Sequence, residues 1–192
     1  MEVIKQKKAL EKGLEIIKKG GVIICPTDTV YGLLCDIYSK KAVGKIFKIK
    51  RRPKTKPLAV FVKDFKMAKK LAEISEQQER ILKKHWPGKF TFILSCELGA
   101  HKKLYGVGKK TIGIRIPKYK FLNDLLKKIN KPLAQTSANI SGKPELKDVR
   151  EIIAVFSKQK NKPDLVIDGG DLKKSKPSKV IDLTGRKEKI LR

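Results

Sequence analysis

Two segments of the sequence carry side chains whose chemistry suits phosphate groups. In the first, KIKRRP, Lys50 and Arg52 stand two positions apart, immediately before Pro53. Side chains at i and i+2 diverge on a helix but point the same way in an extended segment, so both cations could contact one polyphosphate. A charged helix end that complements the helix dipole would explain the same residues. The segment alone leaves both interpretations open.

The second segment, QTSANISGKP, spans residues 135–144 and places Ser137 and Asn139 close to a glycine. Hydroxyl and amide groups suit hydrogen bonds to phosphate or ribose, but an ordinary loop rich in Ser, Asn and Gly has the same composition. A further segment, PTDTVYG at 26–32, directly follows an apolar run. It places Thr29 and Tyr31 at the end of a strand, where α/β proteins bind ligands, although a Pro-initiated turn is the simpler explanation.

The charge distribution favours an anionic ligand or partner. The chain has 47 Lys and Arg residues against 19 Asp and Glu residues, a formal net charge of +28. Lysine supplies most of this excess and is spread along the whole chain, so the total alone leaves nucleic-acid contact undecided. Two stretches contain no acidic residue: 37–63, and 98–123, which includes Arg115. Because a solvated helix face normally mixes both signs, these stretches predict an anion-binding surface.

Several common kinds of site lack their motifs. Cys25, Cys35 and Cys96 lie in or beside apolar runs, which predicts small buried side chains. With only two histidines and no C-x-x-C spacing, the sequence predicts no dedicated metal site. GVGKKT at 106–111 lacks the first glycine of a P-loop and has an extra lysine before Thr111, and no G-x-G-x-x-G follows a strand. An ATP site here would use neither phosphate loop.

Hydrophobic periodicity and cap residues predict alternating helices and strands with short connections. We expect one α/β sheet domain over residues 1–192, with the sheet flanked by helices. Ser39 and the pair Ser75 and Gln78 are expected to begin helices. The polar stretch KKSKPSK at 173–179 is expected to be a surface loop. Helices are expected at 10–20, 39–52, 75–85, 119–129 and 145–157, and strands at 21–25, 57–62, 90–95, 111–116, 132–137, 165–168 and 179–183.

The sequence predicts a cytoplasmic protein without a membrane segment. No stretch approaches the roughly 18 uncharged apolar residues that a membrane span needs. The N-terminal segment alternates charged and apolar residues and lacks the continuous apolar region of a signal peptide.

The order of the motifs along the chain is more specific than any one of them. PTDTVYGL, KIKRRP with KPLAV, WPGKFTFIL, TIGIRIP, TSANISG and PSKVIDLTGRKEKILR together resemble the YrdC-like family, specifically its short-form threonylcarbamoyl-AMP synthases. The resemblance runs from about residue 10 to the C-terminus. Its most specific part is the pair of motifs at Lys50/Arg52 and Ser137/Asn139.

The resemblance implies a twisted mixed sheet with a basic concave face. It also implies synthesis of threonylcarbamoyl-AMP and pyrophosphate from L-threonine, bicarbonate and ATP, with Mg²⁺ carried by the nucleotide. A separate transferase would pass the threonylcarbamoyl group to tRNA. By position, Lys50 and Arg52 would be catalytic and would hold the ATP phosphates. The other nucleotide contacts implied are Thr111, Ser137, Asn139 and Arg192. The threonine pocket implied comprises Thr29, Tyr31, Arg115 and Ser178.

Two features resemble the short form of the family rather than the long form. Long-form members carry a histidine shortly after the proline-leucine pair, where this chain has Val60 and Phe61. Because the sequence ends at Arg192, we also expect no extra C-terminal domain like that of the long form.

Two other functions remain open from the sequence. The same basic face could hold double-stranded RNA or tRNA without any synthase activity. Alternatively, a family member with the same pocket could act on another carboxylate or nucleotide. We expect the side chains of Lys50 and Arg52 to face solvent in an empty cleft, so that alanine at either position leaves the fold intact.

Overall fold

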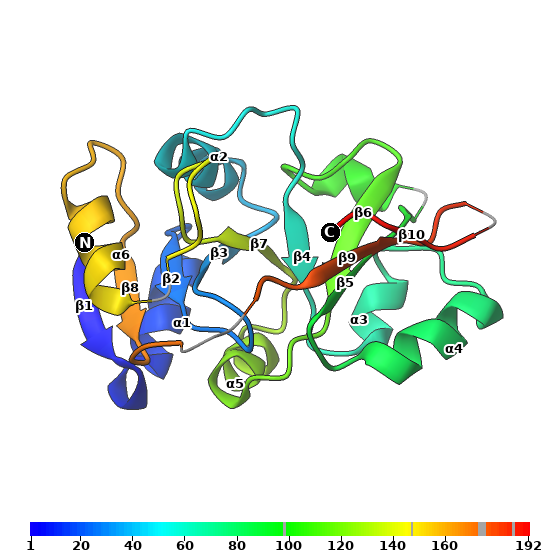
Figure 1. Cartoon of the computed structure of the whole chain (residues 1–192), viewed down its shortest axis with the longest axis horizontal. Helices are drawn as coiled ribbons and strands as arrows, with labels where there is room; N and C mark the ends of the chain where they lie inside the picture. The colour runs from blue at the N-terminus through cyan, green and yellow to red at the C-terminus, as the bar shows by residue number, and fades with distance from the viewer. Residues whose placement is uncertain (98, 147, 173–175, 186) are drawn as a thin grey trace.

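The computed structural model describes residues 1–97, 99–146, 148–172, 176–185 and 187–192. One ten-stranded sheet runs through the molecule, in the order β1-β8-β2-β3-β7-β4-β6-β5-β9-β10 (Figure 1). The strands are β1 Glu2–Lys5, β2 Ile23–Cys25, β3 Gly32–Asp36, β4 Ala59–Phe61, β5 Phe90–Ser95, β6 Thr111–Arg115, β7 Leu133–Ser137, β8 Leu165–Asp168, β9 Lys179–Asp182 and β10 Lys189–Ile190.

The sheet is mixed, which confirms the expected fold class. Its parallel pairs are β1 with β8, β8 with β2, β4 with β6, and β5 with β9. The central strand β7 is antiparallel to both of its neighbours, β3 and β4. The centre of the sheet is therefore built from strands that lie about 20 to 100 positions apart in the sequence.

The helices begin where the cap residues predict. The Ser39 hydroxyl accepts the backbone N–H of Ala42 at 3.2 Å, and Ser75 and Gln78 form a reciprocal capping box. The helices are η1 Gln6–Lys8, α1 Leu10–Lys18, α2 Lys40–Lys50, α3 Phe65–Lys69, α4 Glu76–His85, η2 Ala100–Lys103, α5 Lys120–Ile129 and α6 Val149–Ser157.

The two faces of the sheet are covered unequally. Buried residues of α2, α3, α4 and α6 pack in one cluster against one face. Helices α1 and α5 cover the other face over β8, β2, β3, the start of β7 and the end of β4, where Phe61 packs in their cluster. Alternation along β4 and β6 turns Val60 and Ile114 into the first cluster, while Ala59 and Gly113 point the other way. Among the described residues, no buried residue of β6 or β5 belongs to this second cluster, so that part of the sheet is left uncovered on this face.

Several elements were not predicted. Strand β3, whose residues are all buried, lies at the centre of the sheet, whereas the sequence predicted only a turn before it. Strands β1 and β10 and helix α3 were also missed. Cys25 and Cys35 are buried as expected, while Cys96 is only partly buried. The predicted loop at 173–179 lies partly outside the described residues.

In the described part of the chain, none of the helices has both the length and the apolar character that crossing a bilayer requires.

Candidate active site

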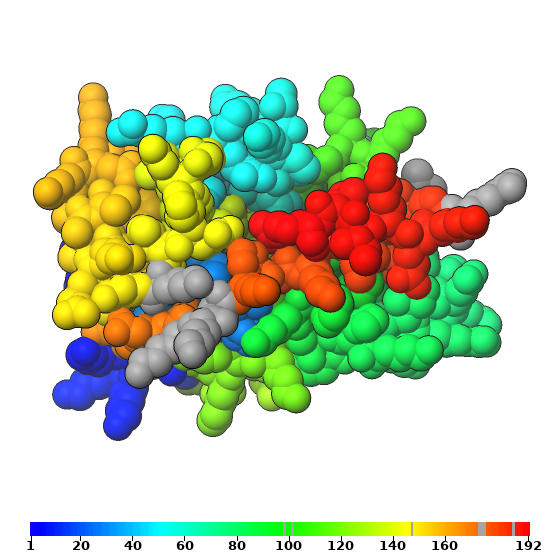
Figure 2. Space-filling view, in the orientation of Figure 1, coloured from blue at the N-terminus to red at the C-terminus, as the bar shows by residue number. Residues whose placement is uncertain are grey.

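A cavity of about 350 Å³ lies over the uncovered part of the sheet. Small residues form the floor of the cavity and leave room above the sheet. Ala59 of β4 pairs with Gly113 of β6, and a Cβ built on Gly113 would lie 3.6 Å from the Cβ of Ala59. In Figure 2 the C-terminal residues (red) lie beside the segment around residues 50–60 (cyan), and both contribute to the lining. The cavity therefore joins segments from nearly the whole length of the chain.

The lining of the cavity is strongly positive. It includes no acidic side chain among its described residues but contains the three arginines Arg52, Arg115 and Arg192. Arg52 donates from Nε to the carbonyl of Lys56 at 3.0 Å and from Nη2 to the carbonyl of Pro57 at 2.9 Å. Burial, and then the charge of Arg192, lowers the pKa of Arg52. An anionic ligand would offset the repulsion between these cations.

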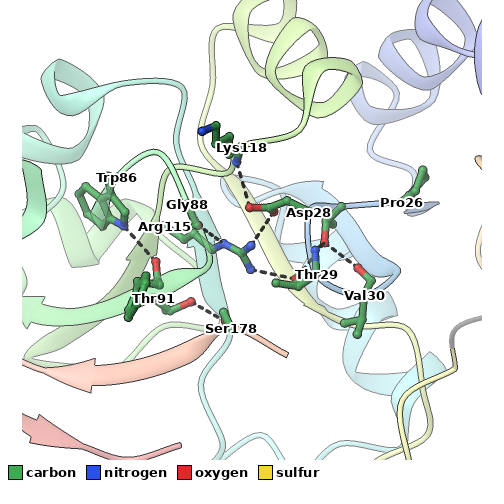
Figure 3. A network of polar contacts seen from close by, with 12 residues as sticks. Pro26, Asp28, Thr29, Val30, Trp86, Gly88, Thr91, Arg115, Lys118 and Ser178 are labelled. Atoms are coloured by element: carbon green, nitrogen blue, oxygen red, sulfur yellow. Dashed lines mark hydrogen bonds and ion pairs between the residues drawn. The ribbon is translucent and has the colours of Figure 1, made fainter. Parts of the chain in front are cut away.

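Arg115 is the centre of a buried polar network (Figure 3). Its guanidinium donates from Nε to the carbonyl of Gly88 at 2.9 Å, from Nη1 to the hydroxyl of Thr29 at 3.1 Å, and from Nη2 to Asp28 Oδ1 at 2.5 Å. The side chains of Arg115 and Asp28 are only 2% and 7% exposed. Asp28 Oδ2 also accepts the backbone N–H of Lys118 at 3.1 Å. Arg115 thus fixes three segments that are far apart in the sequence.

The ion pair changes the interpretation of Arg115. Because Asp28 already neutralises the guanidinium, a ligand carboxylate would meet a site with less net charge than the sequence suggests. Burial lowers the pKa of Arg115, while the carboxylate of Asp28 acts in the opposite direction. Arg115 still lines the cavity, and two of the five N–H groups of its guanidinium lie outside these three hydrogen bonds.

Hydroxyl groups line the cavity beside this network. Thr29 Oγ1 lies 3.0 Å from Thr27 Oγ1, and the hydroxyls of Thr91 and Ser178 lie 3.0 Å apart. The Tyr31 hydroxyl donates to the carbonyl of Gly170 at 2.6 Å, and burial raises the pKa of this phenol. These groups supply hydrogen bonds for a polar ligand without adding charge.

The expected position of Lys50 is wrong. Its side chain does not face solvent: Lys50 is 1% exposed and does not line the cavity. The Nζ atom donates to the carbonyl of Ser137 at 2.5 Å, and to the carbonyl and Oδ1 of Asn139 at 2.8 Å each. Burial, with the charge of Arg52 as the second cause, lowers the pKa of Lys50 to about 7. Lys50 therefore anchors the loop after β7 from behind the cavity.

Asn139 shares this supporting position. Its Oδ1 accepts the Ser137 hydroxyl at 2.7 Å, and its Nδ2 donates to the carbonyl of Lys143 at 2.5 Å. Asn139 does not line the cavity, but Ser137 does. The contact series Lys50–Asn139–Ser137 connects the end of α2 to the cavity wall.

Most of the predicted site residues meet in this cavity. Of the ten, Lys50 and Asn139 lie behind its wall, and the others line it: Thr29, Tyr31, Arg52, Thr111, Arg115, Ser137, Ser178 and Arg192. Asp28, Thr91 and Gly113 were missed. Strand alternation in TIGIRI places Gly113 on the same face as Thr111 and Arg115, and could have identified it. Nothing in the sequence pairs Asp28 with Arg115.

The described residues contain no group of three or more His, Cys, Asp and Glu side chains that could hold a metal ion. The donors around the cavity are hydroxyls, amides and guanidinium groups, which suit anions and polar ligands.

Comparisons with known proteins agree on one family. The model for Sua5, YciO and YrdC proteins, described as "Telomere recombination", matches residues 15–192. A protein of Methanocaldococcus jannaschii named "Putative threonylcarbamoyl-AMP synthase" is 40% identical over 177 residues, which are 90% of this chain and 81% of the relative.

Solved structures give the same result. The structure of Pyrococcus abyssi Sua5 complexed with L-threonine has a TM-score of 0.87 and 32% identity, and covers 100% of this chain. This chain spans only 56% of that longer protein. The structure of Escherichia coli YciO also has a TM-score of 0.87, with 31% identity, and covers 100% of this chain and 93% of its own. The sequence match and these shared folds together place the chain in the Sua5/YciO/YrdC family.

Proposed function

We propose that the protein synthesises threonylcarbamoyl-AMP and pyrophosphate from L-threonine, bicarbonate and ATP, for the modification of tRNA. The observation that carries this proposal is a cavity whose described lining has three arginines, several hydroxyls and no acidic side chain. Relatives named as threonylcarbamoyl-AMP synthases, and the threonine complex of Pyrococcus abyssi Sua5, support the identity of the substrates.

The proposed reaction brings several anions together. The amine of threonine captures bicarbonate as a carbamate with loss of water. An oxygen of the carbamate then attacks the α-phosphate of ATP, the bond to the β-phosphate breaks, and pyrophosphate leaves. The repulsion between carbamate, carboxylate and triphosphate is large unless fixed cations offset it in a partly dry site. Arg52 and Arg192 are placed to do this.

The proposed roles follow from position in the cavity. Arg52 and Arg192 contact the phosphates, with Thr111 and Ser137 as further nucleotide contacts. Arg52 stabilises the charge that accumulates on departing pyrophosphate. Lys50 has a positioning role instead of a direct one, because its ammonium group is engaged with Ser137 and Asn139.

At the other end of the cavity, Thr29, Tyr31, Ser178 and the unengaged N–H groups of Arg115 are the proposed contacts for threonine. Mg²⁺ would arrive with ATP and be held mainly by phosphate oxygens and water, as is usual for this ion. A separate transferase would take the product to tRNA.

The test is pyrophosphate release by the purified protein with Mg-ATP and bicarbonate, with and without L-threonine. We expect release to depend on threonine. Arg52→Ala should reduce kcat/KM by about 100-fold or more, because it removes a donor aimed at developing charge. It should keep the fold, because among the described residues the side chain of Arg52 donates just to the carbonyls of Lys56 and Pro57. Arg80→Ala, on the exposed surface of α4, is the matched control. Threonine-independent release would refute the proposal.

The floor of the cavity provides a second prediction. Gly113→Ala and Gly113→Val should progressively weaken ATP and threonine binding, because the added carbons occupy the ligand space. The strand should tolerate both residues: Gly113 has no positive φ, and its added Cβ makes only ordinary contacts at 3.6 Å or more. Calorimetric titration measures affinity, and urea unfolding measures stability. Equal ligand affinity in all three proteins would show that ligands do not occupy this cavity.

One observation favours a second candidate function. The match to Escherichia coli YciO covers nearly the full length of both chains, and the corresponding curated protein is named as uncharacterised. The cavity could therefore hold another carboxylate in place of threonine. Replacing threonine by other amino acids and small carboxylates in the pyrophosphate assay distinguishes the two functions.

A further inference from the structure

A second groove lies outside the proposed active site. The exposed side of α2 and the segment after α6 enclose a space of about 620 Å³. In Figure 1 these two segments stand side by side at the upper left. Because α2 packs against the opposite face of the sheet from the cavity floor, the groove and the active site do not share a wall. Six lysines line this lysine groove: Lys40, Lys41, Lys45, Lys48, Lys160 and Lys162.

Most of this positive charge has no internal partner. Lys45 pairs with Asp164 at 2.6 Å, and Asp164 also accepts the backbone N–H of Val22 at 2.7 Å. Asp164 is the only acidic residue in the described lining. The other five lysines make no ion pair with any described residue. The groove is therefore an uncompensated cluster of cations from two separate segments.

The position of two lysines on α2 points to an external anion. Lys40 and Lys41 occupy the first turn of the helix, where no acidic residue is present. Positive side chains are unfavourable at this end of a helix, because they oppose the positive pole of the helix dipole. An anion in the groove would be attracted by the exposed lysines and the dipole together.

The dimensions and composition of the groove identify the class of ligand. From Lys40 to Lys48 the row on α2 is about 12 Å long, enough to follow several phosphates of a nucleic-acid strand. Lysine is depleted in protein–protein interfaces, which argues against an acidic protein. Lysines also act as point charges toward phosphate rather than as readers of bases.

We propose that the lysine groove binds the phosphate backbone of RNA. The choice of RNA rests on the proposed function, in which the product is destined for tRNA. Contact through the backbone requires no base sequence, so the groove recognises the charge and helical shape of the RNA.

The test measures binding of a fluorescein-labelled RNA duplex of about 20 base pairs by anisotropy, between about 50 and 200 mM salt. The test variant carries four lysine-to-glutamine changes in the groove, at Lys40, Lys41, Lys48 and Lys160. The matched control removes the same charge elsewhere, at Lys66, Lys70, Lys84 and Lys127. All eight are exposed and make no ion pair with described residues. Glutamine preserves helix propensity.

In the groove variant, the slope of log K against log salt should fall by about one unit for each lysine in contact with phosphate, to a total of three or four. The control variant should keep the slope of the unmodified protein. Equal loss in both variants would overturn the proposal, because general positive charge would then explain binding. Poly-L-glutamate serves as a competitor that imitates an acidic protein. If its binding depends on the same four lysines as strongly as RNA binding does, the proposal is overturned in favour of an acidic protein partner.

The outcome is separable from the proposed function. None of the four groove lysines lines the active-site cavity, so threonine-dependent pyrophosphate release should be unchanged in the groove variant. If the groove variant binds RNA as well as the unmodified protein and still carries out the synthesis, only the proposed RNA site in the groove is refuted. If RNA binding depends on the groove lysines but the unmodified protein shows no threonine-dependent pyrophosphate release, only the proposed reaction is refuted.

Discussion

Replacing Lys50 by methionine is expected to lower the free energy of unfolding by about 3 kcal/mol at pH 9. The change leaves the carbonyls of Ser137 and Asn139 buried without their donor, and each lost partner costs about 1–3 kcal/mol. Urea unfolding measures the difference. Lys48→Met, two residues earlier on the exposed side of α2, is the matched control and should stay within about 0.5 kcal/mol of the unmodified protein. If the Lys50 variant were as stable as the unmodified protein, the buried hydrogen bonds of Nζ would contribute nothing to the free energy of unfolding.

The effect of this substitution should depend on pH. The pKa of Lys50 is lowered by burial to about 7, from an ordinary value of 10.5. Between these values the unfolded chain binds more protons than the folded one, so stability rises with pH. Relative to Lys50→Met, the unmodified protein should gain about 2 kcal/mol from pH 7 to pH 9. A pH-independent difference would mean that the three oxygen acceptors around Nζ outweigh burial and keep Lys50 charged.

Replacing Arg115 by methionine is expected to have a larger effect, a loss of about 3–5 kcal/mol in the free energy of unfolding, because the Asp28 carboxylate stays buried without its cation. Threonine-dependent activity should disappear as well, since the segment that carries Thr29 loses its anchor. Thermal and urea unfolding measure the first effect, and pyrophosphate release measures the second.

A double-mutant cycle separates the ion pair from the rest of the network. Asp28→Asn combined with Arg115→Met removes both charges, so the combined loss should be smaller than the sum of the single losses by about 1–3 kcal/mol. Arg115→Lys keeps the charge but not the planar arrangement of donors, and should restore stability only in part. Simple additivity would contradict a direct coupling between Asp28 and Arg115.

What could be predicted from the sequence was mainly local. The caps at Ser39 and Ser75 involve residues only three positions apart, and the helices after them begin as expected. TIGIRI was correctly predicted to be a strand, and both Thr111 and Arg115 of this strand line the cavity. Parts of the three polar segments singled out in the sequence, 26–32, 48–53 and 135–144, line the cavity.

The missed features depend on partners that are distant in the sequence. Strand β3 has only a short apolar run, and its central place in the sheet depends on pairing with β7, about 100 residues later, as well as with β2. Asp28 and Arg115 lie 87 positions apart. Lys50 is different: its helical phase places it with the buried Val43 and Phe47, so its spacing along the helix indicates burial. The expectation that a cation faces solvent was the error.

The pairing of β2 and β8 has a consequence for folding during synthesis on the ribosome. The hairpin of β2 and β3 can form as soon as residues 23–36 emerge, but its open edges must wait for β7 and β8, which follow about 100 to 130 residues later. Until then both edges can pair with other chains, because unpaired strands are templates for aggregation. The many positive charges of the nascent chain would keep such chains apart by mutual repulsion.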